Sequence, residues 1–261
     1  MRGFSAALWA EVLKIRRSKI FPATLAAVAF LIVVVGFMIF ILKDPEAARK
    51  YGLIATKARI GAGEASWASY HRMLIQVDSI IGLLGFGFVT SWIFGREYSD
   101  RTVKDLLALP VSRETVIAAK FLASALWCLL LSALVFPLWL LVGHLFDLPG
   151  WDPSRLPAWA IAYIEGNLLL LLLSPTTAFF ASVGRGYLAP LAAVMTLIAM
   201  VEISTIIGYG QYFPWAIPVF VLAGADPEVP HLGLGSWIFF SIAVISSLGA
   251  TLAWYRYADQ R

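Results

Sequence analysis

Three acidic residues lie inside long apolar stretches of this chain, where an ionisable side chain is costly to bury. Asp78, Glu165 and Glu202 each fall within a run long enough to cross a bilayer. Acids in such places are candidates for ion or substrate pathways. With a rise of about 1.5 Å per helical residue, Glu165 and Glu202 share a depth. The three acids therefore predict either a polar substrate path between protomers for a cationic or amphipathic cargo, or protonated or hydrogen-bonded contacts between helices.

Residue patterns that support other chemistry are absent. The three histidines are far apart in the chain, and no zinc-protease, serine-hydrolase or P-loop motif occurs. Cys128 lies in an apolar run without a basic neighbour that would favour its thiolate. We therefore expect no catalytic residues, no metal site and no enzyme activity in this chain.

The composition is that of a membrane protein. Of the 261 residues, 60% are hydrophobic and 14% are charged, with a mean hydropathy of +0.81. Soluble domains have about 45–50% apolar and about 25% charged residues. The chain is therefore predicted to be an all-α membrane protein, with the lipid bilayer as a partner and no nucleic acid.

Six apolar runs approach or exceed the roughly 20 residues that a membrane-crossing helix needs. They cover residues 22–42, 75–94, 115–143, 156–183, 187–208 and 236–255. With both termini inside, 13 of the 20 Lys and Arg residues fall in cytoplasmic segments and 7 fall outside. The positive-inside rule therefore predicts a multi-pass protein of the cell membrane with cytoplasmic N- and C-termini.

Residues 1–21 form a basic segment before the first apolar run. Phe4, Leu8, Val12 and Ile15 share one face of a helical wheel, and Lys14 and Arg17 lie opposite. This pattern predicts an amphipathic helix in the membrane interface with its cations near anionic headgroups. A basic flank without helical order is the alternative.

Residues 209–234 form an apolar segment that is too short in its centre to span. The segment has no Lys or Arg, contains four prolines, and is most apolar at residues 214–224. We expect it to enter the outer leaflet, shielded by protein because lipid-exposed irregular backbone is not tolerated. An outer loop that lies on the membrane is the alternative.

Residues 99–110 are a polar stretch between the second and third apolar runs. Ser99 is of a type that caps helices, and Asp100 suits the positive end of a helix dipole. The apolar positions follow i, i+3, i+4, i+7 spacing and are Val103, Leu106, Leu107 and Pro110. The opposite face holds Arg101, Lys104 and Asp105. A short amphipathic helix is therefore predicted.

Pro110 ends this predicted helix, because a proline disfavours helical backbone in the residue before it. Ser112 then caps the helix of the third span, with Glu114 in its first turn. The leucine face between the two spans could fit a groove of another protein or rest on the membrane surface. Periodicity alone does not distinguish these two arrangements.

This stretch resembles the cytoplasmic loop of type-2 ABC exporter permeases, the membrane subunits of ATP-driven exporters. The shared features are an acid after the second span, a threonine, a leucine pair, a Pro-x-Ser/Thr-Arg motif and a lysine entering the third span. Here they are Glu97, Thr102, Leu106, Leu107, Pro110, Ser112, Arg113 and Lys120. Arg101 departs from the pattern, because glycine commonly precedes the threonine. The N-terminal helix, the six spans and the apolar outer segment extend the resemblance to the whole chain.

The resemblance implies that residues 99–110 are a coupling helix that docks on an ABC ATPase subunit. The implied coupling residues are Glu97, Asp100, Arg101, Thr102, Val103, Lys104, Leu106, Leu107, Pro110, Ser112 and Arg113. It also implies two ATPase chains and a second permease chain, identical or related to this one. ATP and Mg²⁺ would bind the ATPase chains, so this chain itself is expected to hold no cofactor. The cargo is not specified by these residues.

Two other functions fit parts of the same sequence. A membrane-embedded assembly or immunity protein would use the polar stretch to bind a partner without transport. An intramembrane enzyme or ion pathway would use Asp78, Glu165 and Glu202.

Overall fold

The computed structural model describes residues 2–43, 52, 65–102, 111–224 and 231–257, and the regular elements in these ranges are all helical. Three short elements accompany the longer helices, two of them single 3₁₀ turns. In chain order the elements are α1 Arg2–Arg17, α2 Ile20–Lys43, α4 Trp67–Ser99, α6 Arg113–Leu145, η2 Pro153–Arg155, α7 Leu156–Leu172, α8 Ser174–Val183, α9 Leu188–Ile206, η3 Gly210–Tyr212, α10 Ile217–Ala223 and α11 Leu234–Tyr257.

Six helical segments are long and apolar enough to cross a membrane. Five of them are α2, α4, α6, α9 and α11, and the sixth is the combined segment Pro153–Val183. The prediction of an all-α membrane protein with six spans is therefore confirmed.

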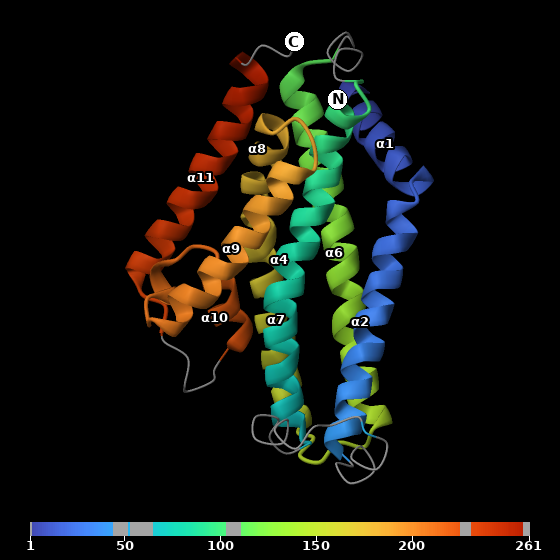
Figure 1. Ribbon diagram of the computed structural model, residues 1–261, viewed down its shortest axis with the longest axis vertical. Coiled ribbons are helices and arrows are strands. Elements are labelled where there is room, and N and C mark those ends of the chain that lie inside the picture. The colour runs from blue at the N-terminus through green and yellow to red at the C-terminus, as the bar shows by residue number, and fades with distance from the viewer. Residues whose placement is uncertain (1, 44–51, 53–64, 103–110, 225–230, 258–261) are drawn as a thin grey trace.

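The helices form an elongated bundle in which α4 contacts α6, α7, α8, α9 and α10 (Figure 1). On one side α2 packs against α6, and on the other α11 packs against α8. The start of α1 and the end of α11 lie at the upper end of the bundle in Figure 1. The last turn of α4 and the first turn of α6 lie at this upper end as well. Segments far apart in the sequence therefore meet there.

The fourth span is broken, which corrects the prediction of one continuous helix over residues 156–183. The first part, α7, ends at Leu172, and α8 begins at Ser174. Pro175 lies in the first turn of α8. Proline has no N–H group, and its ring clashes with the preceding helical turn, so the helix is interrupted there.

The second span is longer than the predicted residues 75–94, because α4 runs from Trp67 to Ser99. Ser66 caps its start, accepting a hydrogen bond from the backbone N–H of Ser69 at 3.3 Å. The extension brings Arg72 into the helix, below the apolar run that the sequence defines.

Helix α1 ends at Arg17, and a bend at Ser18 and Lys19 separates it from α2. The Ser18 hydroxyl donates to the Ile15 carbonyl at 2.8 Å and accepts from the Phe21 N–H at 3.3 Å. One side chain thus serves the end of α1 and the start of α2. The buried Ile15 and the partly buried Leu8 join the main hydrophobic core, so α1 is part of the bundle.

The short helix α10 follows α9 and packs against α7 and α4. Its buried residues are Ile217, Pro218, Phe220 and Leu222. The contact with α7 is close at Gly166, where an added Cβ would lie 2.7 Å from Leu222 Cδ2. Of the predicted outer segment 209–234, residues 225–230 lie outside the described ranges. In the described part, protein covers the apolar face of α10.

Candidate functional site

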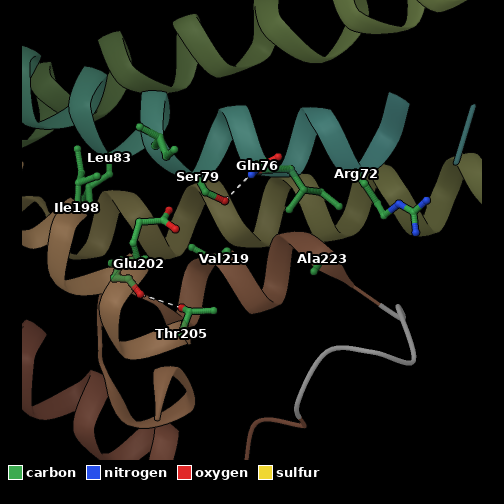
Figure 2. A pocket seen from close by; sticks show the side chains of 12 residues that line it. Arg72, Gln76, Ser79, Leu83, Ile198, Glu202, Thr205, Val219 and Ala223 are labelled. Carbon is green, nitrogen blue, oxygen red and sulfur yellow. Dashed lines mark hydrogen bonds between the residues drawn. The ribbon is translucent and has the colours of Figure 1, made fainter. Parts of the chain in front are cut away.

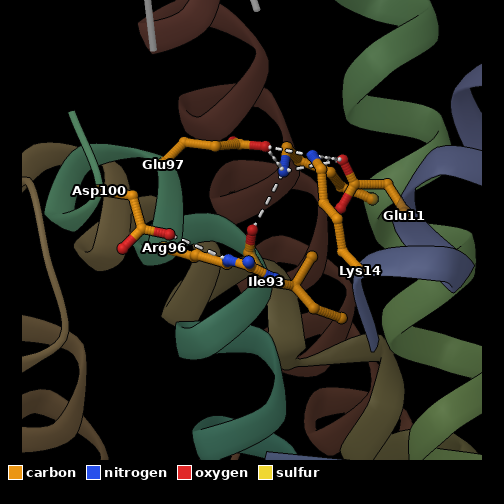
Figure 3. Close-up of polar contacts among 7 residues, drawn as sticks. Glu11, Lys14, Ile93, Arg96, Glu97 and Asp100 are labelled. Carbon is orange, nitrogen blue, oxygen red and sulfur yellow. Dashed lines mark hydrogen bonds and ion pairs between the residues drawn. The ribbon is translucent and has the colours of Figure 1, made fainter. Parts of the chain in front are cut away.

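Four charged side chains from three helices meet at the upper end of the bundle (Figure 3). Lys120 of α6 donates to Glu97 of α4 at 2.7 Å, to Glu11 of α1 at 3.3 Å and to the Ile93 carbonyl at 3.1 Å. Lys14 of α1 donates to Glu11 at 2.7 Å and to Glu97 at 2.9 Å. Each lysine therefore contacts both glutamates. We call Glu11, Lys14, Glu97 and Lys120 the charge cluster.

The charge cluster is electrically balanced, and its members other than the partly exposed Lys14 are buried. Lys120 is fully buried, and Glu11 and Glu97 are each 5% exposed. Two carboxylates and two ammonium groups sum to zero charge, and all three N–H donors of Lys120 have an acceptor. Removing one member would leave a buried charge uncompensated, which costs about 3–5 kcal/mol in buried ion pairs. The cluster therefore holds α1, α4 and α6 in one arrangement.

Lys14 points toward this cluster, which corrects the prediction that it faces lipid headgroups. Burial alone lowers the pKa of Lys14, but the carboxylates of Glu97 and Glu11 outweigh it, so the pKa is raised above 10.5. Among the residues of this segment whose exposure the structure describes, Arg16, Arg17 and Lys19 are exposed cations.

Glu11 was not among the predicted site residues, although the sequence contains a signal for it. It lies three residues after Leu8 and four before Ile15, so it belongs to the apolar face of α1. An acid on the face of a helix that enters a core requires a buried partner. The partners Glu97 and Lys120 were predicted as motif residues, but their contact with α1 was not.

Helix α4 ends in a Schellman motif at the predicted coupling stretch. Thr102 N–H donates to the Glu97 carbonyl at 2.8 Å, and Arg101 N–H donates to the Tyr98 carbonyl at 3.3 Å. Arg101 has a φ of 58°, the left-handed conformation that glycine adopts at this position of the motif. The residue that departs from the family pattern thus occupies a backbone position that favours glycine.

The start of the predicted coupling helix at Ser99 is wrong, because Ser99 is the last residue of α4. Asp100 is the C-cap of α4, and its carboxylate pairs with Arg96 at 3.1 Å. The remaining predicted coupling residues, Val103, Lys104, Leu106, Leu107 and Pro110, lie outside the described residues.

The start of α6 agrees with the predicted cap. Ser112 is the N-cap and accepts a hydrogen bond from the Thr115 N–H at 3.2 Å, with Glu114 in the first turn. Arg113 donates from Nη1 to the Tyr255 carbonyl at 3.0 Å, near the end of α11. The beginning of α6 is therefore tied to the last span as well as to the charge cluster.

Asp78 is buried in the bundle and belongs to a polar contact between helices. Its carboxylate accepts a hydrogen bond from Asn167 Nδ2 at 2.9 Å. Asn167 Oδ1 accepts a hydrogen bond from Ser132 Oγ at 2.8 Å, and Asn167 Nδ2 also donates to the Tyr163 backbone carbonyl at 3.0 Å. This network joins α4, α6 and α7, as the helix-contact alternative for Asp78 requires.

The other two predicted path residues lie in different surroundings. Glu165 is exposed on α7, on the same face as the exposed Ile161, Ile164 and Leu168. Glu202 is exposed on α9, where it lines a groove between α4, α9 and α10. Of the three acids only Glu202 lines this groove. A path between two permease chains that includes Asp78 and Glu165 stays a prediction.

The groove has a volume of about 280 Å³. One wall is a stripe along α4 with Arg72, Gln76, Ser79 and Leu83 at three- and four-residue spacing. Opposite it lie residues of α9 and α10, including Ile198, Glu202, Thr205, Val219 and Ala223. Figure 2 shows Glu202 extending toward α4 near Ser79, whereas Arg72 lies at the far end of the stripe. Arg72 lines this groove because α4 begins at Trp67, before the predicted start of the span at residue 75.

These features define a multi-pass α-helical membrane protein with a charged helix junction at one end. Residues 7–202 match the profile of the ABC-2 family transporter proteins, so the chain belongs to this family. The bacitracin transport permease protein BCRB of Bacillus licheniformis is 30% identical over 190 residues, which cover 71% of this chain and 88% of that protein. No solved structure matches the chain.

The comparisons confirm the resemblance to type-2 ABC permeases. They support a transporter membrane subunit, a kind of protein that is not itself an enzyme. Membership of the family implies an ABC ATPase and the membrane as partners.

Proposed function

We propose that this chain is the permease subunit of an ATP-driven exporter in the cell membrane. The upper end of the bundle and both termini lie in the cytoplasm, in keeping with the distribution of Lys and Arg. A separate ATPase chain binds ATP and Mg²⁺ and hydrolyses the nucleotide. Two permease chains, identical or related, assemble with two ATPase chains.

The observation that carries this proposal is the charge cluster. The predicted ATPase contact, residues 99–110, connects α4 to α6. Glu97 lies in the last turn of α4, and Lys120 lies two turns into α6, and the two side chains are in direct contact. Glu11 and Lys14 add α1 to the same unit. A force on the connection would therefore move α1, α4 and α6 together.

In this mechanism, ATP-driven closure of the two ATPases pushes on the connection between α4 and α6. The predicted contacts are Asp100, Arg101, Thr102, Val103, Lys104, Leu106, Leu107, Pro110, Ser112 and Arg113, with Glu97 behind them in the cluster. Their movement reaches α4, which lines the groove that contains Glu202. Arg113 transmits part of this movement to α11 through the hydrogen bond that it donates to the Tyr255 carbonyl.

Reconstitution tests this function. The chain is purified with its ATPase partner, placed in liposomes, and assayed for ATP hydrolysis and for ATP-dependent movement of cargo. Bacitracin is the first compound to test, because the relative is named for its transport. Compound-stimulated hydrolysis with net transport is the expected result. Stable binding to a partner without nucleotide-dependent transport would favour an assembly or immunity protein instead.

A further inference from the structure

Within the described residues, Glu202 is the one acid that lines the groove between α4, α9 and α10. Neither Glu202 nor Arg72 takes part in a salt bridge there. Both charges are therefore available to a ligand. Most of the remaining lining is apolar, with neutral hydrogen-bonding groups at Gln76, Ser79 and Thr205.

The groove is asymmetric along its length. Arg72 and Ser79 are seven residues apart on α4, which corresponds to about 10 Å along the helix axis. Glu202 lies near Ser79, so the negative group and the positive group are at opposite ends (Figure 2). A ligand amine near Arg72 would be repelled, whereas near Glu202 it would be attracted and partly desolvated. The charges therefore select both the ligand and its orientation.

We propose that this groove binds an amphipathic amine, with the ammonium group at Glu202 and a hydrogen-bond acceptor at Arg72. An apolar body about 10 Å long lies between these ends, along the stripe of α4. The volume of about 280 Å³ is just below the range of roughly 300–1,000 Å³ that is usual for small-molecule pockets. A single small amphiphile, or one end of a larger one, fits this space. The inference rests on the proposed function, since it describes what that function would transport.

The probe for this site is dansylcadaverine, which has a primary amine at one end, an apolar linker, and sulfonyl oxygens beside a fluorescent naphthalene ring. The full chain, co-purified with its ATPase, is placed in nanodiscs of neutral phosphatidylcholine without ATP. Binding is measured from the increase in dansyl fluorescence. The N-acetylated probe has the same body without the positive charge and is the matched ligand control.

Glu202→Gln is expected to weaken dansylcadaverine binding about tenfold or more, because hydrogen bonds to a charged group are the stronger ones. Glu165→Gln is the matched protein control, since Glu165 is an exposed acid of another span that does not line the groove. It should bind the probe as the unchanged chain does. The Glu202→Lys chain should no longer bind dansylcadaverine and should gain affinity for a dansyl probe that ends in a carboxylate.

Equal binding by the Glu202→Gln and unchanged chains would overturn the proposal, as would an equal loss in Glu165→Gln. Strong binding of the acetylated probe would also overturn it, because the positive charge would then be irrelevant. The assay uses no nucleotide, so its failure leaves the ATP-dependent transport test unaffected. Conversely, specific binding without any transport would contradict the proposed function and leave the amine site in place.

Discussion

The Lys120 ammonium lies 2.7 Å from the Glu97 carboxylate, and the lysine is fully buried. This pair joins the last turn of α4 to the second turn of α6, on either side of the predicted ATPase contact. Glu11 and Lys14 extend the pair into a balanced group of four charges. The amphipathic N-terminal helix is thereby a structural part of the bundle, where the sequence predicted only a surface anchor.

Removal of one member of the central pair should destabilise the bundle strongly. Lys120→Met leaves two glutamates facing one lysine, and the expected loss is about 3–5 kcal/mol of unfolding free energy. The combined change Glu97→Gln and Lys120→Met should cost less than the sum of the two single changes, because the uncompensated charge is removed. Thermal unfolding in detergent measures the stability of the unchanged chain, the two single variants and the double variant, which form a double-mutant cycle. The exposed Arg96–Asp100 pair is the control, since Asp100→Asn should change stability by less than about 1 kcal/mol.

Arg101→Gly should stabilise the end of α4. Arg101 has a φ of 58°, and left-handed backbone costs a residue with a side chain roughly 1–2 kcal/mol. Loss of the arginine charge near the helix C-terminus offsets a few tenths of this gain. A higher unfolding temperature is expected for Arg101→Gly and a lower one for Arg101→Val. The opposite order would show that the backbone conformation does not determine stability there.

Asp78→Asn should preserve folding and transport, because an asparagine carbonyl can still accept the hydrogen bond from Asn167. Asp78→Leu leaves one of the two N–H groups of Asn167 Nδ2 without an acceptor and should cost about 1–3 kcal/mol. Expression, unfolding temperature and transport are compared for both variants. A folded Asp78→Asn chain with no transport would assign Asp78 to the path after all.

The ion pair between Lys14 of α1 and Glu97 of α4 should persist in moderate alkali and weaken in strong alkali. The folded pKa of Lys14 is raised above 10.5, so the stability from its ammonium group is fully present below that pH. It is lost as the pH rises through the folded pKa, because the charge is then removed. Unfolding temperatures measured from pH 9 to strong alkali should show this loss in the unchanged chain. Lys14→Met should lack that part of the decline.

The sequence allowed prediction of the features that depend on local pattern. Apolar run length identified the six spans, and Ser112 was recognised as a cap from its type and place. The break in the fourth span was also readable, since Pro175 stands within the run, but the run was treated as one helix. Each of these features depends on residues close together in the chain.

Features that depend on which helices are neighbours were not predictable from one sequence. Lys14 was placed toward lipid because a helical wheel shows directions but not partners. Glu97 on α4, together with Glu11, provides the carboxylates that turn Lys14 inward. Similarly, Asp78 and Glu202 looked equivalent in their spans, and only the packing separates a buried helix contact from a groove-lining acid.

Co-purification of the ATPase with a chain altered at the α4–α6 connection tests whether this connection holds the ATPase. The variant combines Arg101→Glu, Lys104→Glu and Leu106→Asp, and Arg155→Glu, an exposed charge in the short turn before α7, is the control. We expect the triple variant to insert into the membrane at the normal level but no longer to retain the ATPase, whereas the Arg155→Glu chain should retain it fully. Undiminished co-purification with the triple variant would contradict the account.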